Sequence, residues 1–256
     1  MYKILSPETV TVAEGAVIED GVVIHSGNVI GGSVILRRGA VLYPNNIVED
    51  SEIGEEAELT ASVVRGAKVG RGAKVGPFAN LRAGAVVGEN CRVGDFVEIK
   101  NAAVGAGSKI SHLAYVGDAR VGENVNIGCG VVFCNFDGRS KHFTEVGSGA
   151  FIGSNANLVA PVRIGENAFV AAGTTVTRDV PAGACVIGRV RQEESEGIRK
   201  KRCKSSPGEG VRGEGGGLWA RCAARTVSAA SRGKNSRPAR LSPSATRFPA
   251  SNKTPA

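Results

Sequence analysis

The sequence predicts an all-β solenoid in which one chain winds into a parallel β-helix. Large aliphatic residues recur every six positions over most of the chain, a spacing that neither an α-helix nor an ordinary β-strand produces. Glycine often follows the aliphatic residue and supplies the backbone freedom that a tight corner needs. Aromatic residues make up only 5% of the 256 residues, so we expect a thin, layered, aliphatic core.

Three six-residue units would close one triangular coil of about 18 residues, and stacked coils would pair edge to edge at the usual strand spacing. The array from Ile18 to Val176 then corresponds to roughly nine coils and a prism about 40 Å long. Periodicity alone does not determine the hand of the coil. Its aliphatic positions, with single-residue slips, are Ile18, Ile24, Ile30, Leu36, Leu42, Ile53, Leu59, Val69, Val75, Leu81, Val87, Val93, Ile99, Val104, Ile110, Val116, Val121, Ile127, Phe133, Val146, Ile152, Leu158, Ile164, Val170 and Val176.

Residues 134–145 break the period. They read CNFDGRSKHFTE, a polar stretch with Asp137-Gly138 at its centre. Asp-Gly favours a turn, so we expect this segment to project from the solenoid as a loop.

The chain divides into three predicted parts. Residues 1–190 form the β-helix domain, the charged segment 191–202 can form a short helical cap, and 203–256 is a basic tail rich in Gly, Ser, Arg and Pro that we expect to be disordered. Residues 199–256 hold 14 Lys and Arg against 2 acidic residues. The net charge of +8 therefore belongs to the tail, and we expect no specific nucleic-acid partner.

Composition also excludes several classes. The six cysteines form no CxxC pair, which argues against a zinc cluster or a disulfide framework and fits a reducing cytoplasm. No apolar run approaches the length of a membrane span, and the first residues lack a signal-peptide core. The sequence thus predicts a cytoplasmic protein with no membrane partner.

Seven collinear segments carry a resemblance to a known family. They are GPFANLRAG (76–84), GDFVEIK (94–100), SHLAYVGD (111–118), GENVNIGCG (122–130), CNFDGRSKH (134–142), FIGSNANLVAPV (151–162) and AAGTTVTRDV (171–180). These segments resemble the acetyltransferase half of bifunctional GlmU, the bacterial enzyme that combines glucosamine-1-phosphate N-acetyltransferase and N-acetylglucosamine-1-phosphate uridyltransferase. The resemblance implies a left-handed parallel β-helix, homotrimers with active sites between subunits, and acetyl-CoA as the donor that N-acetylates glucosamine-1-phosphate on the way to UDP-N-acetylglucosamine.

His112 is the candidate catalytic base. An amine that attacks a thioester must lose a proton, and histidine suits this task near neutral pH. His112 interrupts an otherwise aliphatic coil, and the resemblance assigns it the catalytic role; a structural histidine is the alternative. Glu98, one coil earlier at nearly the same phase, is expected to orient the imidazole. His25 and His142 fit a surface location.

Cations are expected for a sugar phosphate. Arg82 and Lys100 are 18 residues apart, one full coil, so they should stack on one face of the prism. From the resemblance, these residues bind the sugar phosphate or the nucleotide sugar UDP-N-acetylglucosamine, Tyr115 and Asn126 contact the sugar, and Lys141 reaches across the trimer. Without the resemblance, both cations would be interpreted as solvated surface charges.

The backbone near Gly128 and Gly130 could stabilise the oxyanion formed on thioester attack. The resemblance implies a catalytic and donor contact at Asn135. Cys129 and Phe136 depart from the family pattern, which commonly has alanine and tyrosine there. Cys129 and Cys134 also permit a covalent route, although small buried thiols commonly only pack. The acetyl-CoA contacts implied by the resemblance are Cys129, Asn135, Phe136, Ser154, Ala172 and Arg189.

Other readings remain open. A related acyltransferase with a different amine or hydroxyl acceptor and a non-catalytic, truncated solenoid would both keep the repeat. A γ-type carbonic anhydrase needs three metal-binding histidines in neighbouring coils, and His25, His112 and His142 are not so spaced. The nucleotide motif and metal-binding aspartate of the uridyltransferase half have no counterpart, so we expect neither nucleotidyl transfer nor a metal site.

Overall fold

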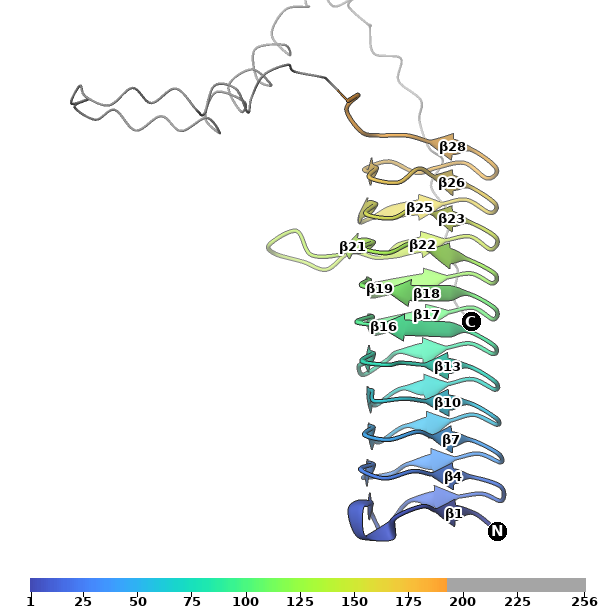
Figure 1. Ribbon diagram of the computed structural model, residues 1–256. Coiled ribbons are helices and arrows are strands. Elements are labelled where there is room, and N and C mark those ends of the chain that lie inside the picture. The colour runs from blue at the N-terminus through green and yellow to red at the C-terminus, as the bar shows by residue number, and fades with distance from the viewer. Residues whose placement is uncertain (193–256) are drawn as a thin grey trace, which may run out of the picture. The chain divides into compact units, whose positions relative to one another are not determined.

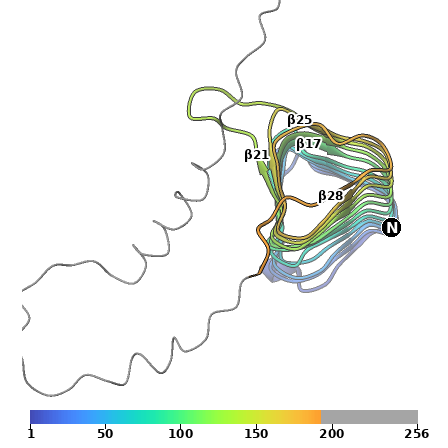
Figure 2. The same cartoon turned by 90° about the horizontal axis from the view of Figure 1, so that it is seen from above.

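The computed structural model describes residues 1–192, and these wind into a three-sided prism (Figures 1 and 2). All strand pairs are parallel, and an 11-stranded sheet contains one strand from each successive coil. The all-β, left-handed parallel β-helix predicted from the sequence is confirmed. The cap and the disordered tail predicted for 191–202 and 203–256 lie, from residue 193 onward, outside the described residues.

We call the three sides of the prism faces A, B and C. A single short 3₁₀ helix, η1 (Pro7–Thr9), lies near the N-terminus of the described part. Face A consists of β1 (Lys3–Ile4), β4 (Val23–Ile24), β7 (Val41–Leu42), β10 (Glu58–Leu59), β13 (Lys74–Val75), β16 (Arg92–Asp95), β18 (Lys109–His112), β20 (Asn126–Ile127), β23 (Phe151–Ile152), β26 (Phe169–Val170) and β28 (Cys185–Val186).

Face B follows face A along each coil. It consists of β2 (Thr11–Val12), β5 (Val29–Gly31), β8 (Ile47–Glu49), β11 (Val63–Arg65), β14 (Asn80–Leu81), the first half of β17 (Glu98–Val104), the first half of β19 (Tyr115–Val121), β21 (Val132–Cys134), β24 (Asn157–Val159) and β27 (Thr175–Val176).

Face C completes the coil. It consists of β3 (Val17–Ile18), β6 (Ile35–Leu36), β9 (Glu52–Ile53), β12 (Lys68–Val69), β15 (Val86–Val87), the second halves of β17 and β19, β22 (Thr144–Val146) and β25 (Val162–Ile164). Because β17 and β19 continue through a corner, faces B and C are joined into one hydrogen-bonded network there.

The core is the stack of repeated aliphatic side chains predicted from the sequence. Ile24, Leu42, Leu59 and Ile110 are fully buried on face A, and Phe133 is the largest fully buried side chain. Burying such side chains stabilises the fold by about 1.5–3 kcal/mol each before the entropy cost of ordering them. The slips in the period appear as coils of 16 or 17 residues instead of 18. The predicted loop is also present: residues 135–143 project between β21 and β22 (Figure 1).

Candidate active site

His112 ends β18 at the corner between faces A and B. Its Cα is in register with that of Asp95, which ends β16 on the preceding coil. The Nδ1 atom of His112 lies 2.6 Å from Oδ1 of Asp95. The hydrogen bond from His112 holds the pKa of the Asp95 carboxyl below its ordinary value. The histidine is therefore paired with a carboxylate, and 59% of its side chain remains exposed.

The expected pairing of Glu98 with His112 is wrong. Glu98 lies beyond the corner on β17, in register with Tyr115, and its Oε1 accepts a hydrogen bond from Nη1 of Arg82 at 2.7 Å. The coil between Asp95 and His112 is 17 residues long, one shorter than the ideal repeat, so residue 95 has the same phase as His112. In the sequence, the 17-residue spacing between Asp95 and His112 was the feature that could have predicted this pair.

Several predicted donor contacts lie at the same corner as His112. We call Asp95, His112, Cys129, Ser154 and Ala172 the corner column, because each follows a face A core aliphatic by two positions on successive coils. The backbone ties these coils together: Asn155 N donates to Cys129 O at 2.7 Å and Gly173 N to Ser154 O at 2.8 Å. The candidate base and three candidate donor contacts thus form a single line along one edge of the prism.

Arg189 extends this line beyond Ala172. Its Nη1 donates to Ala172 O at 2.9 Å, and its Cδ lies close to where a Cβ on Gly173 would project. The guanidinium therefore lies at the end of the corner column, where a phosphate of an elongated ligand could reach it.

The cations lie on face B, next to this corner. Leu81 pairs with Ile99, so the residues that follow them, Arg82 and Lys100, stack as predicted. The resemblance implied that Lys141 reaches across a trimer, but within this chain it comes from the projecting loop to the side of Lys100. The neighbouring Lys141 ammonium, and to a smaller extent Arg82, lower the pKa of Lys100. Three cations on one patch form a ready site for a dianion such as a phosphate.

A buried carboxylate lies behind this patch. Asp118, 8% exposed, accepts hydrogen bonds from Asn101 Nδ2 at 2.6 Å and Asn135 Nδ2 at 2.5 Å. Asn135 Nδ2 also lies 3.3 Å from the Tyr115 hydroxyl. A Cβ at Gly117 would come within 2.3 Å of that hydroxyl, so only glycine leaves room for this arrangement. Sequence reasoning found Asn135 and Tyr115 but missed Asp118 and Asn101. Both missed residues lie at corners with φ near +46°, a backbone conformation in which Asn and Asp are enriched, so their residue type predicts the corner but not the contact.

The loop has its own internal support. Asp137 accepts hydrogen bonds from the backbone N–H groups of Ser140 and Arg139, and its Oδ2 lies 2.7 Å from Nε2 of His142. These contacts, the Ser140 N–H first, hold the pKa of the Asp137 carboxyl far below its ordinary value. Phe136 pairs with Lys141 across the loop and is 61% exposed. The contact between His142 and Asp137 thus stabilises the loop that carries Lys141.

One predicted sugar contact lies apart from the others. Asn126 is on face A, in register with Lys109 and Phe151, whereas Tyr115 and Lys100 are on face B. Within one chain the structure therefore brings together Arg82, Lys100, Tyr115, Asn135 and Lys141, but not Asn126. His25 lies far down the prism on face A and packs against Tyr43, with ring centroids 5.2 Å apart.

Other features of the described part bear on the class of site. Within residues 1–192, no group of three or more His, Cys, Asp or Glu side chains is arranged to hold a metal ion. No helix in this part is long and apolar enough to cross a membrane. A cavity of about 470 Å³ is lined by residues 175–181 and 184–188 at the last coils, away from His112.

Comparison with known proteins identifies the repeat and its relatives. Residues 66–101 and 143–178 match the family described as bacterial transferase hexapeptide, six repeats. The chain is 54% identical over 125 residues to bifunctional protein GlmU of Shouchella clausii. The matched region covers 49% of this chain and 28% of that protein. It is 52% identical over 128 residues to GlmU of Caldicellulosiruptor saccharolyticus, with the same coverage. The predicted resemblance to GlmU is confirmed, and the chain spans less than a third of the length of these relatives.

A solved structure supports the fold. Arabidopsis UDP-N-acetylglucosamine acyltransferase matches with a TM-score of 0.52 and 22% identity, over 72% of this chain and 71% of that one. At this identity the likeness concerns the β-helix alone.

Proposed function

We propose that this protein transfers the acetyl group of acetyl-CoA to the amine of glucosamine-1-phosphate, a step toward UDP-N-acetylglucosamine. The observation that carries the proposal is the corner column: a histidine paired with a carboxylate stands in line with Cys129, Ser154 and Ala172, and a three-cation patch occupies the adjoining face. The similarity to bifunctional GlmU supports the same reaction.

The proposed chemistry uses each group for one task. Arg82, Lys100 and Lys141 bind the phosphate and hold the sugar amine near the corner. Nε2 of His112 takes the amine proton as the nitrogen attacks the thioester carbonyl. When the tetrahedral intermediate collapses, the C–S bond breaks, the imidazolium returns the proton to the sulfur, and CoA leaves as the thiol. In this proposal backbone N–H groups near Cys129 stabilise the oxyanion, while the Asn135 amide, bonded to Asp118 and beside the Tyr115 hydroxyl, holds the adjoining sugar site.

The donor would lie along the prism edge. Ser154 and Ala172 are two and three coils from His112, or about 10 and 15 Å at the usual strand spacing. A pantetheine arm spans such a length, and Arg189 then meets a CoA phosphate at the far end. Phe136, exposed on the loop, is the proposed contact on the other side of the donor.

We also propose that the active form is a homotrimer with sites between subunits. His112 is more than half exposed in one chain, and Asn126 lies on a face that the cation patch does not share. A neighbouring copy packed along this corner would cover the histidine and could supply the missing sugar contact. Light scattering coupled to size-exclusion chromatography tests this: a mass of three chains is expected, and a monomer that retains full activity would contradict it.

The test of the activity is direct. Purified protein is incubated with acetyl-CoA and glucosamine-1-phosphate, and the products are analysed by mass spectrometry and by thiol release. N-acetylglucosamine-1-phosphate is expected in step with free CoA. Free glucosamine, galactosamine-1-phosphate and serine serve as alternative acceptors, and a preference for any of them would replace the proposed substrate.

A matched pair of variants links the activity to the site. His112→Ala removes the candidate base, and we expect kcat to fall by about 10²-fold or more. His25→Ala removes a histidine on the same face far from the site and should leave kcat unchanged. Equal kcat values for His112→Ala and His25→Ala would contradict the role of His112 as the base.

A further inference from the structure

The corner that carries His112 is stiff where Asp95 and His112 meet. β16 and β18 are paired over Arg92↔Lys109, Val93↔Ile110 and Asp95↔His112, and Leu113 N donates to Asp95 O at 2.9 Å. The two coils approach so closely that a Cβ on Gly94 would lie 2.0 Å from Ser111 O. The backbone therefore determines the separation of the two side chains.

The other nearby carboxylates of the described part are engaged elsewhere. Glu98 is bonded to Arg82, and Asp118 is bonded to two asparagine amides. Asp95 is the residue whose carboxylate contacts the imidazole, at 2.6 Å from Nδ1.

We propose that Asp95 is the positioning residue of His112: its carboxylate accepts the Nδ1–H bond and so fixes the neutral imidazole in the tautomer whose free lone pair is on Nε2. An ionised carboxylate has no proton to donate, so Nδ1 must carry the hydrogen of this bond. An ordinary aspartate carboxyl is already ionised near neutral pH, and the bond from His112 lowers the pKa of Asp95 further. The ring is held by its inner nitrogen and leaves Nε2 as the base.

This arrangement has a consequence for the proposed reaction, on which the catalytic part of the inference rests. When Nε2 takes the amine proton, the ring becomes an imidazolium that keeps its Nδ1–H bond to Asp95. The carboxylate stabilises that cation without itself being protonated. Asp95 then affects turnover through His112, whereas substrate affinity depends on the cation patch.

The first test reads the tautomer and needs no activity. The chain contains three histidines, so ¹⁵N-histidine labelling of the full protein gives few side-chain signals, and the His112→Gln variant identifies those of His112. In the wild type, the neutral ring of His112 should have a protonated Nδ1 and an unprotonated Nε2. Asp95→Ala should move the proton toward Nε2 or produce a mixture.

Asp137→Asn is the matched control, because it removes the carboxylate beside His142 and should change the His142 signals while leaving those of His112 as they were. An unchanged His112 spectrum in Asp95→Ala, or a wild-type His112 already protonated at Nε2, overturns the proposal. Circular dichroism of each variant checks that the β-helix is intact.

The second test separates turnover from binding. We expect Asp95→Ala to lower kcat by on the order of 10- to 100-fold with KM for both substrates within about twofold, because one charge-assisted hydrogen bond is lost. Asp95→Glu should restore part of the loss. An unaltered kcat overturns the positioning role. If the wild type acetylates none of the acceptors, the proposed function fails while the tautomer result still decides the role of Asp95.

Discussion

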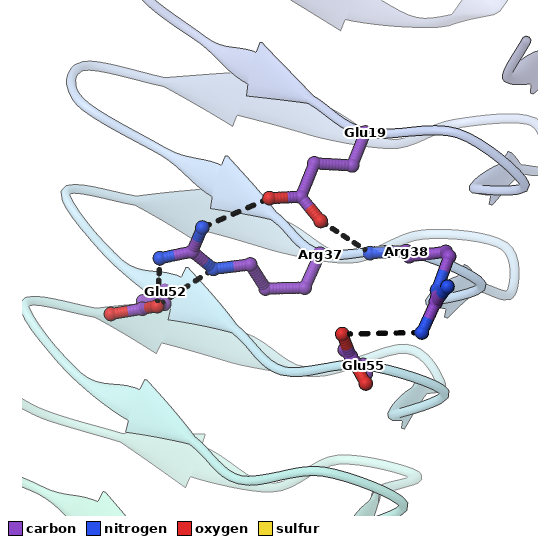
Figure 3. A network of polar contacts seen from close by, with 5 residues as sticks. All are labelled: Glu19, Arg37, Arg38, Glu52 and Glu55. Atoms are coloured by element: carbon purple, nitrogen blue, oxygen red, sulfur yellow. Dashed lines mark hydrogen bonds and ion pairs between the residues drawn. The ribbon is translucent and has the colours of Figure 1, made fainter.

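Arg37 in the N-terminal coils and Lys100 in the middle coils occupy equivalent outward positions next to a core residue, but their surroundings are opposite. Arg37 lies between two carboxylates: its Nη1 is 2.9 Å from Glu19, and its Nη2 is 2.6 Å from Glu52 (Figure 3). These hydrogen bonds, Glu19 first, raise the pKa of Arg37. Lys100 is flanked by Lys141 and Arg82, which lower its pKa.

The difference distinguishes a structural charge from a functional one on the same scaffold. In the N-terminal coils Arg37 has carboxylate partners one coil above and one coil below, so opposite charges offset one another and hold adjacent coils together; Arg38 with Glu55 repeats the pattern (Figure 3). Around Lys100 two like charges remain: the Lys141 ammonium lies beside it, and Arg82, although paired with Glu98 at 2.7 Å, also lowers its pKa. Such repulsion is relieved when an anion binds, which is why this patch is the proposed phosphate site.

The largest expected effect is on activity at the cation patch. Lys100→Met should lower kcat/KM for glucosamine-1-phosphate by on the order of 10- to 100-fold, since a charge-assisted contact to phosphate is lost. Arg37→Met, the matched change in the N-terminal coils, should leave kcat/KM within about twofold. Steady-state kinetics on both variants check this, and equal losses would remove the distinction between the two regions.

The next effect is on stability at the corner between faces B and C. Asp50 and Asp118 both sit there with φ near +46°, but Asp118 is buried against two amides whereas Asp50 bonds the exposed backbone N–H of Ser33. Asp118→Asn should lower the free energy of unfolding by about 1–3 kcal/mol, because an amide meets an amide donor where a carboxylate accepted. Asp50→Asn should change it by less than about 0.5 kcal/mol.

Thermal or denaturant unfolding of the two variants measures this difference. A loss at Asp50 as large as that at Asp118 would mean that the buried amide network contributes nothing specific. Asparagine tolerates the left-handed backbone as well as aspartate does, so backbone strain does not confound the comparison.

A smaller effect is expected on thermal stability, which should depend on inorganic phosphate and on pH through Lys100. Because the folded-state pKa of Lys100 lies below its ordinary value of 10.5, the unfolded chain binds the proton more tightly. Below the folded-state pKa of Lys100, its repulsion by Lys141 and Arg82 is fully present. Between that pKa and 10.5, Lys100 loses its proton in the folded chain before it does in the unfolded chain, so the free energy of unfolding rises with pH. Inorganic phosphate should therefore raise the melting temperature at pH 7.5 more than at pH 10.5.

Differential scanning fluorimetry at both pH values, on the wild type and Lys100→Met, provides the measurement. The phosphate-dependent increment should shrink in the variant at pH 7.5. An equal increment in both proteins would show that phosphate acts elsewhere.

The smallest effect is expected at the exposed pair of Arg38 and Glu55, whose atoms are 3.6 Å apart. Glu55→Gln should change the free energy of unfolding by less than about 0.5 kcal/mol, since solvent screens such pairs.

Glu19→Gln removes a carboxyl whose pKa Arg37 lowers. The stabilisation from Glu19 is present above the ordinary carboxyl pKa and is lost as pH falls through the lowered one, so the wild type and this variant should converge in melting temperature at acidic pH.

The sequence by itself determined the β-helix and part of the site. A six-residue period of buried aliphatics can be satisfied only by short strands at fixed phase, so Arg82 over Lys100 and Ser154 below Ala172 followed from a spacing of one coil. The residue pattern singled out His112 as a lone imidazole in an aliphatic coil, and the resemblance to GlmU made it the candidate base.

The tertiary structure decided which groups touch. A coil of 17 residues put Asp95 rather than Glu98 beside His112, and the excursion of the loop brought Lys141 to Lys100 and Asn135 to Asp118. Such contacts depend on the phase lost or gained at each corner and on the path of a polar loop, for which the hydrophobic pattern supplies no restraint. Core burial fixes where the coils lie, while the hydrogen bonds between polar side chains depend on the exact path of the backbone at the corners and in the loop.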